Sequence, residues 1–216
     1  MRLLVTGFEP FDGETVNPSG EILSALAPEP SRGVELTTLE LPVRGRVSFE
    51  LLIPAIEGGD IDAWLGLGQA SGRPQLSVER VGINMLVTRD EEGGASNEQL
   101  LVDEGPAAYF SQLPVVQLAR HINDAGAPAV VSNSSGTYIC NEVTYVVQHH
   151  LASAGRELPS GFIHLPYLPE QTAGKPLATP SMALATQLLG VRAAIEFVRD
   201  LAAAPMAVAQ VGGSRG

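Results

Sequence analysis

The only cysteine of this 216-residue chain, Cys140, is the side chain best suited to nucleophilic chemistry. It lies between a loop of small residues, 132–138, and a run in which apolar residues recur with helical spacing, 143–151. We therefore expect it where a loop turns into a helix. The unpaired N–H groups and positive potential of a helix N-terminus favour a thiolate over a thiol. The alternative is a small buried hydrophobic side chain, the usual state of a free cysteine, and position alone does not separate the two.

A thiol nucleophile needs a base, and the chain holds four histidines. His149 and His150 lie more than two helical turns from Cys140, roughly 13 Å at the usual rise per residue, which is too far. His121 lies in a polar part of another expected helix, so we expect it to face solvent. His164 ends an expected strand and precedes a proline, which makes it the best candidate for the base. The other interpretation of His164 is a core histidine bonded to backbone.

The base in turn needs an acceptor that orients it. Glu79 is the best-placed carboxylate, because it interrupts the otherwise apolar, strand-like run 76–87. The other interpretation of Glu79 is a local ion pair with Arg73 or Arg80. A thiol, an imidazole and a carboxylate are the residue types of nucleophilic catalysis with an oriented base.

Other chemistries are not indicated by the sequence. The single cysteine and the adjacent pair His149 and His150 do not have the spacing of a zinc site. Ser134-Ser135-Gly136 does not match the Gly-x-Ser-x-Gly pattern of a serine nucleophile. The loop 7–19 carries neither of the glycine-rich patterns that cradle phosphates. We therefore expect no metal and no cofactor.

The composition limits the compartment and the partners. The net charge of −11 argues against nucleic acid or an anionic membrane as a partner. No apolar run approaches the roughly 20 residues that span a bilayer, and the opening residues do not resemble a signal peptide. One cysteine cannot form an internal disulfide and suits a reducing compartment, so we expect a cytoplasmic protein.

Strand-like and helix-like segments mostly alternate along the chain, which favours an α/β sheet sandwiched between helices. Strands are expected at residues 2–6, 34–41, 61–67, 76–87, 128–132 and 161–165. Helices are expected from residue 18, over 47–56 with a break or kink at Pro54, over 115–125, from Cys140 to a stop at Gly155, and over 181–204. We expect residues 1–216 to form a single domain.

Functional sites in such folds lie at the carboxyl ends of strands. Four turn-rich loops follow the strands that end near residues 6, 67, 132 and 165, and we expect these loops to share one edge of the sheet. Residues 89–111 show little periodicity, so we expect an irregular stretch there that is a candidate flap over the site. The tail, 210–216, is expected to fray.

Six motifs follow one another along nearly the whole chain. They are residues 6–19 (TGFEPFDGETVNPS), 68–73 (GQASGR), 79–84 (ERVGIN), 105–109 (GPAAY), 135–141 (SGTYICN) and 161–171 (GFIHLPYLPEQ). Together and in this order they resemble pyroglutamyl-peptidase I, also called pyrrolidone-carboxylate peptidase, a family of cysteine omega-peptidases. Each motif alone is unspecific, whereas six in register are highly specific.

The resemblance implies a catalytic triad at Cys140, His164 and Glu79, the three residues that their types and positions had already indicated. It implies that Arg89, ten residues after the glutamate, helps to hold the oxyanion, with the backbone N–H of Cys140 as the other donor. The implied substrates are peptides with an N-terminal pyroglutamate, a neutral lactam that suits aromatic faces and amide-type hydrogen bonds.

The resemblance also implies a pocket, a fold and an assembly. Phe8 and Phe11 would line the pocket for the pyroglutamyl ring, and Gln69 would offer hydrogen bonds to the lactam. Further substrate-binding positions carried over from the family are Asn17, Tyr138 and Ile139. The implied fold is a three-layer α/β/α sandwich with an open, mostly parallel, mixed and twisted sheet, similar to the nucleoside-phosphorylase-like enzymes. The implied assembly is a homotetramer or homodimer.

The sequence departs from the family pattern near the pocket. Asp90 stands where an apolar residue is expected after Arg89, Asp12 replaces a commoner glycine, and Val43 replaces a frequent hydroxyl. Two alternatives remain at this point: a nucleoside phosphorylase- or hydrolase-like enzyme on the same fold, and an inactive binding homologue. The first would need clustered basic residues or a glycine cradle, and the second is disfavoured because all three triad positions are filled.

Overall fold

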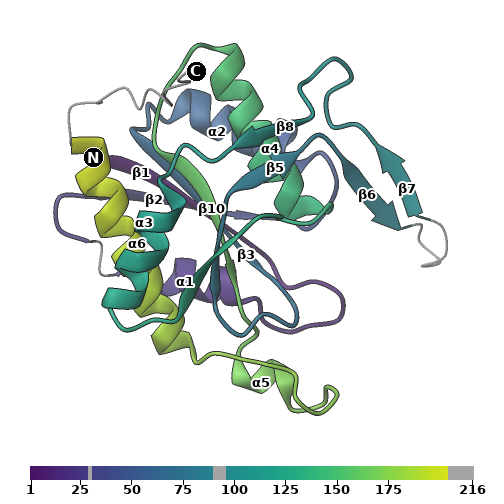
Figure 1. The fold of residues 1–216 in the computed structure, drawn as a ribbon, viewed down its shortest axis with the longest axis vertical. Helices are drawn as coiled ribbons and strands as arrows, with labels where there is room; N and C mark the ends of the chain where they lie inside the picture. The colour runs from purple at the N-terminus through teal and green to yellow at the C-terminus, as the bar shows by residue number, and fades with distance from the viewer. Residues whose placement is uncertain (29–30, 90–95, 204–216) are drawn as a thin grey trace, which may run out of the picture.

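The computed structural model describes residues 1–28, 31–89 and 96–203 (Figure 1). At positions 89 and 96 only the backbone is described. The last residues expected to fray, 210–216, lie outside this part of the chain.

A six-stranded mixed sheet forms the centre of the fold (Figure 1). In chain order its strands are β1 (Arg2–Phe8), β2 (Glu35–Leu41), β3 (Ala63–Gln69), β4 (Leu76–Glu79), β9 (Ala129–Ser132) and β10 (Ser160–Leu165). Their order across the sheet is β2-β1-β3-β10-β4-β9. The first four in this order run parallel, β4 runs antiparallel to β10, and β9 runs parallel to β4. The central strands β3 and β10 are buried along their whole length, as is usual for strands covered on both faces.

Helices cover both faces of the sheet (Figure 1). One face carries α1 (Pro18–Leu26), α3 (Val115–Asp124) and α6 (Leu184–Ala203). The other carries α4 (Ile139–Ser153) and α2 (Ile53–Gly58), which follows a π-helical turn at Ser48–Leu52. A short helix, α5 (Pro169–Thr172), follows β10. The expected α/β/α sandwich with a mostly parallel, mixed sheet is confirmed.

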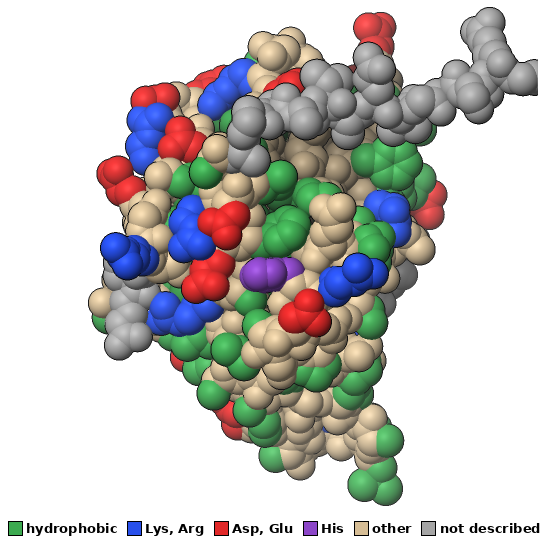
Figure 2. All heavy atoms as spheres, turned by 60° about the vertical axis from the view of Figure 1, so that its left-hand side comes forward, with side chains coloured by type: hydrophobic (Ala, Val, Ile, Leu, Met, Phe, Trp, Pro, Cys, Tyr) green, Lys and Arg blue, Asp and Glu red, His purple; other side chains and the backbone are tan. Residues whose placement is uncertain are grey.

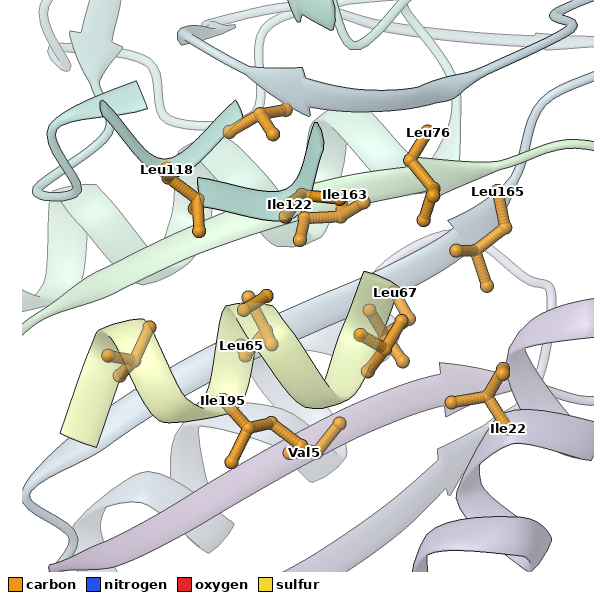
Figure 3. Packing of buried hydrophobic residues seen from close by; sticks show 14 of the residues in the cluster. Val5, Ile22, Leu65, Leu67, Leu76, Leu118, Ile122, Ile163, Leu165 and Ile195 are labelled. Carbon is orange, nitrogen blue, oxygen red and sulfur yellow. The ribbon is translucent and has the colours of Figure 1, made fainter. Parts of the chain in front are cut away.

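Alternation along the strands divides the core into two clusters, because neighbouring residues of a strand point to opposite faces. Leu65 and Leu67 of β3 and Ile163 of β10 belong to the cluster under α1, α3 and α6. Figure 3 shows this cluster packed between the sheet and two of these helices, α3 and α6. Trp64 and Phe162 belong to the opposite cluster, under α4 and α2. Each central strand therefore fixes a helix layer on both sides.

Local sequence signals set the helix ends. Asn17 caps α1, where its side chain accepts a hydrogen bond from the N–H of Ser19, and Pro18 occupies the first turn. Gly155 follows α4 with a φ of 62°, a left-handed conformation that glycine adopts without strain. The break expected at Pro54 is present as the π-helical turn just before it, in which the N–H of Ile53 donates to the carbonyl of Ser48.

The run 76–87 was expected as one strand and is divided into three. After β4 the chain leaves the main sheet and forms β5 (Val81–Ile83) and β6 (Leu86–Arg89). β5 pairs with β8 (Ala108–Phe110), and β6 pairs with β7 (Ser96–Gln99). The apolar run predicts extended backbone correctly, but pairing partners far along the chain decide which sheet each piece joins.

The stretch 89–111 was expected to be irregular, yet it contains β7 and β8. The side chains of β7 described by the structure are exposed, so no apolar alternation marks this strand in the sequence. The β6–β7 hairpin extends away from the main sheet (Figure 1). Residues 90–95, including Asp90, lie outside the described part of the chain, and the expected role of this segment as a flap stays a prediction.

Figure 2 shows basic and acidic side chains close to one another on the side of the molecule formed by α3 and α6. None of the described helices is long and apolar enough to cross a membrane.

Candidate active site

His164 and Glu79 lie on the face of the sheet that α4 covers. Glu79 ends β4 and pairs in register with Phe162, which precedes His164 by two residues on β10 and shares its face. Nδ1 of His164 lies 2.7 Å from Oε1 of Glu79. The ring of Phe162 packs edge-on against the imidazole, with ring centres 5.0 Å apart. The imidazole is thus oriented by a carboxylate and not by backbone.

Glu79 also forms an ion pair with Arg73. Nη1 of Arg73 lies 2.5 Å from the same Oε1 that His164 contacts, and the side chain of Glu79 is fully buried. Arg80 turns away and donates from Nε to Oδ1 of Asn133 at 2.8 Å. Both interpretations of Glu79 therefore hold together: it orients His164 and it pairs with one of the two arginines considered.

Cys140 lies in the first turn of α4, as its position between loop and helix predicts. The residue before the helix, Tyr138, makes no capping hydrogen bond with its side chain. The start of α4 lies against β3, because a Cβ placed on Gly68 would come within 2.9 Å of Sγ of Cys140. Gly68 is the register partner of His164. The sulfur therefore lies beside the strand pair that carries the imidazole, where only glycine leaves room for it.

One expectation about the site is wrong. The loops after β1, β3 and β10 leave the same edge of the sheet, but β9 runs in the opposite direction, so the loop after it starts elsewhere. Ser132 at the end of β9 pairs with Glu79, and residues 133–138 lead from there to Cys140. Alternating strands and helices give parallel strands only where each connection crosses over and brings the chain back to the same edge of the sheet.

The protonation of the pair also differs from the expectation for a helix N-terminus. Burial raises the pKa of Cys140 to about 12, helped by the negative charge of Glu79, and Arg73 and the backbone N–H of Cys140 lower it only in part. Burial lowers the pKa of His164; Glu79 raises it in part, and Arg73 lowers it further. Both shifts favour a thiol and a neutral imidazole over a thiolate and an imidazolium.

A cavity of about 270 Å³ joins the cysteine and the histidine. Its walls come from the end of β1 and the loop after it, the loop after β2, the end of β3 and the loop after it, the segment before α4 with the start of that helix, and the end of β10. The lining residues are Phe8, Phe11, Asn17, Val43, Gln69, Ala70, Ser71, Arg73, Ser135, Gly136, Thr137, Tyr138, Ile139, Cys140 and His164. Glu79 lies behind His164 and does not reach the cavity wall.

Both predicted aromatic residues line this cavity. Phe8 is also buried in the core cluster under α4, so it caps the core and lines the pocket at the same time. Asn17 lines the wall, but its amide holds the loop: Nδ2 donates to the carbonyl of Glu9, and Oδ1 accepts from the N–H and the hydroxyl of Ser19. We read Asn17 as a residue that shapes the wall.

Gln69 lines the cavity with part of its amide already engaged. Nε2 of Gln171 donates to Oε1 of Gln69 at 2.8 Å. This assignment is consistent, since Oε1 of Gln171 accepts the N–H of Leu168. Gln69 therefore retains its Nε2 donor for a ligand.

Tyr138 and Ile139 line the wall just before Cys140, Tyr138 largely exposed and Ile139 buried. The side chain of Arg89 lies outside the described part of the chain. Its strand borders the site, because the N–H of Val87 donates at 2.7 Å to the carbonyl of Thr137, a residue of the cavity wall.

Sequence reasoning had not assigned Arg73 or Ser135 to the site. Both lie in motifs that it had singled out, 68–73 and 135–141, which was the available signal. Among the described residues, no group of three or more His, Cys, Asp or Glu side chains is arranged to hold a metal ion.

The sequence model of the pyroglutamyl peptidase family matches residues 1–200. This chain belongs to that family. A pyrrolidone-carboxylate peptidase of Treponema denticola is 42% identical over 203 residues, which are 92% of this chain and 93% of the relative. One of Streptomyces coelicolor is 44% identical over 194 residues, 89% of each chain. The family expected from the six motifs is confirmed.

Solved structures of the family agree with the fold. The pyroglutamyl peptidase I of Bacillus amyloliquefaciens superposes with a TM-score of 0.84 at 34% identity, covering 92% of this chain and 94% of its own. The pyrrolidone carboxyl peptidase of Fervidobacterium islandicum gives a TM-score of 0.86 at 38% identity, covering 93% and 99%. The alternative of a nucleoside phosphorylase is not favoured.

Proposed function

We propose that this protein removes N-terminal pyroglutamyl residues from peptides, with Cys140 as nucleophile, His164 as base and acid, and Glu79 as orienting acceptor. The observation that carries the proposal is one cavity lined by the cysteine and by a histidine held at 2.7 Å by a buried carboxylate. Membership of the pyroglutamyl peptidase family supplies the substrate class.

The cavity suits a small neutral ring. Pyroglutamate has no free α-amine, so its pocket needs no anion to bind a cation. Phe8, Phe11, Val43 and Ile139 provide apolar and aromatic surface, and Gln69 retains a donor for the lactam carbonyl. A volume of about 270 Å³ lies near the low end for small-molecule sites and fits a single residue better than a longer segment.

The protonation states favour a mechanism in which the thiol loses its proton as it attacks. His164 keeps Nδ1 on Glu79, so Nε2 is the ring atom that takes the proton of Cys140. The sulfur then adds to the pyroglutamyl carbonyl. The imidazolium returns the proton to the leaving amine, and water, activated by the same imidazole, hydrolyses the thioester.

The buried carboxylate of Glu79 stabilises the imidazolium that forms during this transfer, because opposite charges in contact favour the charged form. The N–H of Cys140, in the uncapped first turn of α4, is our candidate for one oxyanion donor. We propose Arg89 as the other, supported by its strand bordering the cavity wall.

The direct test is turnover of a chromogenic pyroglutamyl amide by the reduced protein. We expect release of the chromophore, and its loss after alkylation with iodoacetamide, because the chain has a single thiol. A matched amide of proline, which lacks the lactam carbonyl, should not be cleaved. Absence of turnover by reduced, folded protein would refute the proposal.

Gly68→Ala is expected to lower kcat/KM by about 100-fold, because a small displacement of reacting groups has effects of this size. The added Cβ would come within 2.9 Å of Sγ of Cys140 and 2.7 Å of the ring of Phe162, so the nucleophile must move. Gly58→Ala, which adds a methyl group into open space at the end of α2, is the control. Unchanged kcat/KM in Gly68→Ala would mean that the sulfur does not react from this position.

We further propose a single catalytic domain that acts in the cytoplasm as a homodimer or homotetramer, without nucleic acid or membrane as a partner. The single cysteine, which has no partner for an internal disulfide, supports the reducing compartment. The oligomeric state rests on the family alone, and light scattering of the purified protein tests it.

A further inference from the structure

Arg73 connects the carboxylate that orients His164 with the segment that leads into Cys140. It lies in the loop after β3, where Gly72 has a φ of 78° and turns the chain. Nη1 contacts Oε1 of Glu79 at 2.5 Å, and Nη2 donates to the carbonyl of Ser134 at 3.0 Å. Ser134 belongs to the segment that leads into Cys140. One planar guanidinium thus connects the acceptor of the base to the loop of the nucleophile, with a fork geometry that a lysine does not reproduce.

The position is also electrostatically special. Glu79 is fully buried, and its Oε1 accepts from both His164 and Arg73, while Oε2 has no hydrogen-bond partner among the described residues. Burying a carboxylate without a partner costs free energy. A neutral His164 does not balance the negative charge of Glu79, so the guanidinium of Arg73 does.

The charged and titratable groups around the reacting pair come from four elements. They are Glu79 of β4, His164 of β10, Cys140 of α4 and Arg73 of the loop after β3. Arg80 follows Glu79 directly, yet its guanidinium is bonded to Asn133 instead. Arg73 is therefore the cation in contact with this group in the described part of the chain.

We propose that Arg73 is a positioning residue of the catalytic site, whose charge sets the pH range in which the Cys140–His164 pair is reactive. The catalytic half of this statement rests on the function proposed above. The protonation half does not, because it is measurable without turnover.

The direction of the effect follows from the sign of the charge. The guanidinium lowers the pKa of Cys140 and also lowers the pKa of His164, in each case as a smaller cause beside burial. Its removal raises both. The thiolate then forms at higher pH, and His164 stays protonated, and hence unable to accept a proton, up to higher pH.

The experiment uses the single cysteine as its own probe. A thiolate displaces iodide from iodoacetamide to form a thioether, so the rate of alkylation at the Cys140 peptide, followed by mass spectrometry against pH, titrates the only thiol of the chain. We expect Arg73→Met to alkylate at least several-fold more slowly at a fixed pH below the midpoint, because loss of the cation raises the pKa of Cys140. The acid limb of kcat/KM should move to higher pH in the same variant.

Two further variants separate charge from structure. Arg73→Lys retains the charge and should restore the midpoints while kcat/KM stays below that of the parent protein, because the fork is lost. Arg80→Met removes the neighbouring arginine, which also bonds the loop before Cys140, and should leave both midpoints unchanged. If Arg73→Met does not fold, Arg73→Gln, which retains hydrogen-bonding capacity without charge, takes its place.

A uniform loss of rate with unchanged midpoints in Arg73→Met or Arg73→Gln would overturn the proposal and make Arg73 a structural residue. An equal shift of the midpoints in Arg80→Met would also overturn it, because any nearby positive charge would then have the same effect. A shifted alkylation profile in a protein that hydrolyses no pyroglutamyl amide would support the protonation role and refute the proposed function alone.

Discussion

Cys140→Ser is expected to lower hydrolysis of a pyroglutamyl amide by ~10⁴-fold or more, the usual size of the loss when a catalytic nucleophile is removed. Serine is close in size to cysteine, so the tight space beside Gly68 stays filled. The hydroxyl is a far weaker acid than a thiol, and His164, whose pKa burial lowers, is a weak base for it. Steady-state kinetics with titrated substrate gives the loss directly.

The control for this variant is Ser153→Ala, an exposed position at the far end of the same helix, which should keep full activity. Thermal unfolding of Cys140→Ser should stay close to that of the parent protein. Hydrolysis that persists in Cys140→Ser after removal of contaminating peptidase would contradict a thiol mechanism.

His164→Ala has the second of the largest expected effects. Burial and the charge of Glu79 raise the pKa of Cys140 far above that of a free thiol, so at pH 7 almost no thiolate forms without a base. We expect a loss of ~10⁴-fold or more at pH 7, with residual activity that rises about tenfold per pH unit as hydroxide replaces the base. The parent protein should instead show an acid limb below the ordinary histidine pKa, because burial lowers the pKa of His164.

Glu79→Gln is the graded comparison for His164→Ala. The amide oxygen can still accept the Nδ1–H of His164, so orientation is retained while the charge that stabilises the imidazolium is lost. The loss should be smaller than in Cys140→Ser or His164→Ala. A loss as complete as theirs would mean that Glu79 does more than orient the base.

For His164→Ala, a residual rate that does not change with pH would show that His164 is not the base.

The sequence indicated three candidate catalytic positions because each had a local mark. Cys140 preceded a helical repeat, His164 ended a strand before proline, and Glu79 interrupted an apolar run. Such marks are visible in the sequence, because the periodicity of helices and strands relates residues only a few positions apart. The six ordered motifs then predicted the family, and the family match confirmed it.

The sequence did not predict the strand directions or the hairpin. β9 runs in the direction opposite to β10, and β7 consists of polar residues that pair with β6. Pairing partners far apart in the chain leave no periodic trace, and propensity yields to them. For the same reason the run 76–87 shows extended backbone in the sequence but not its division among three sheets.

The sequence by itself determined the family and the fold class, and it singled out Cys140, His164 and Glu79 as candidate catalytic residues. Only the tertiary structure decided their partners and the direction in which the pKa values of Cys140 and His164 shift. A helix N-terminus predicts a lowered pKa for Cys140, whereas burial and Glu79 raise it; Arg73, from a fourth segment, completes the ion pair. Desolvation and charge depend on every atom within several ångströms, and those atoms come from segments that the chain brings together only when it folds.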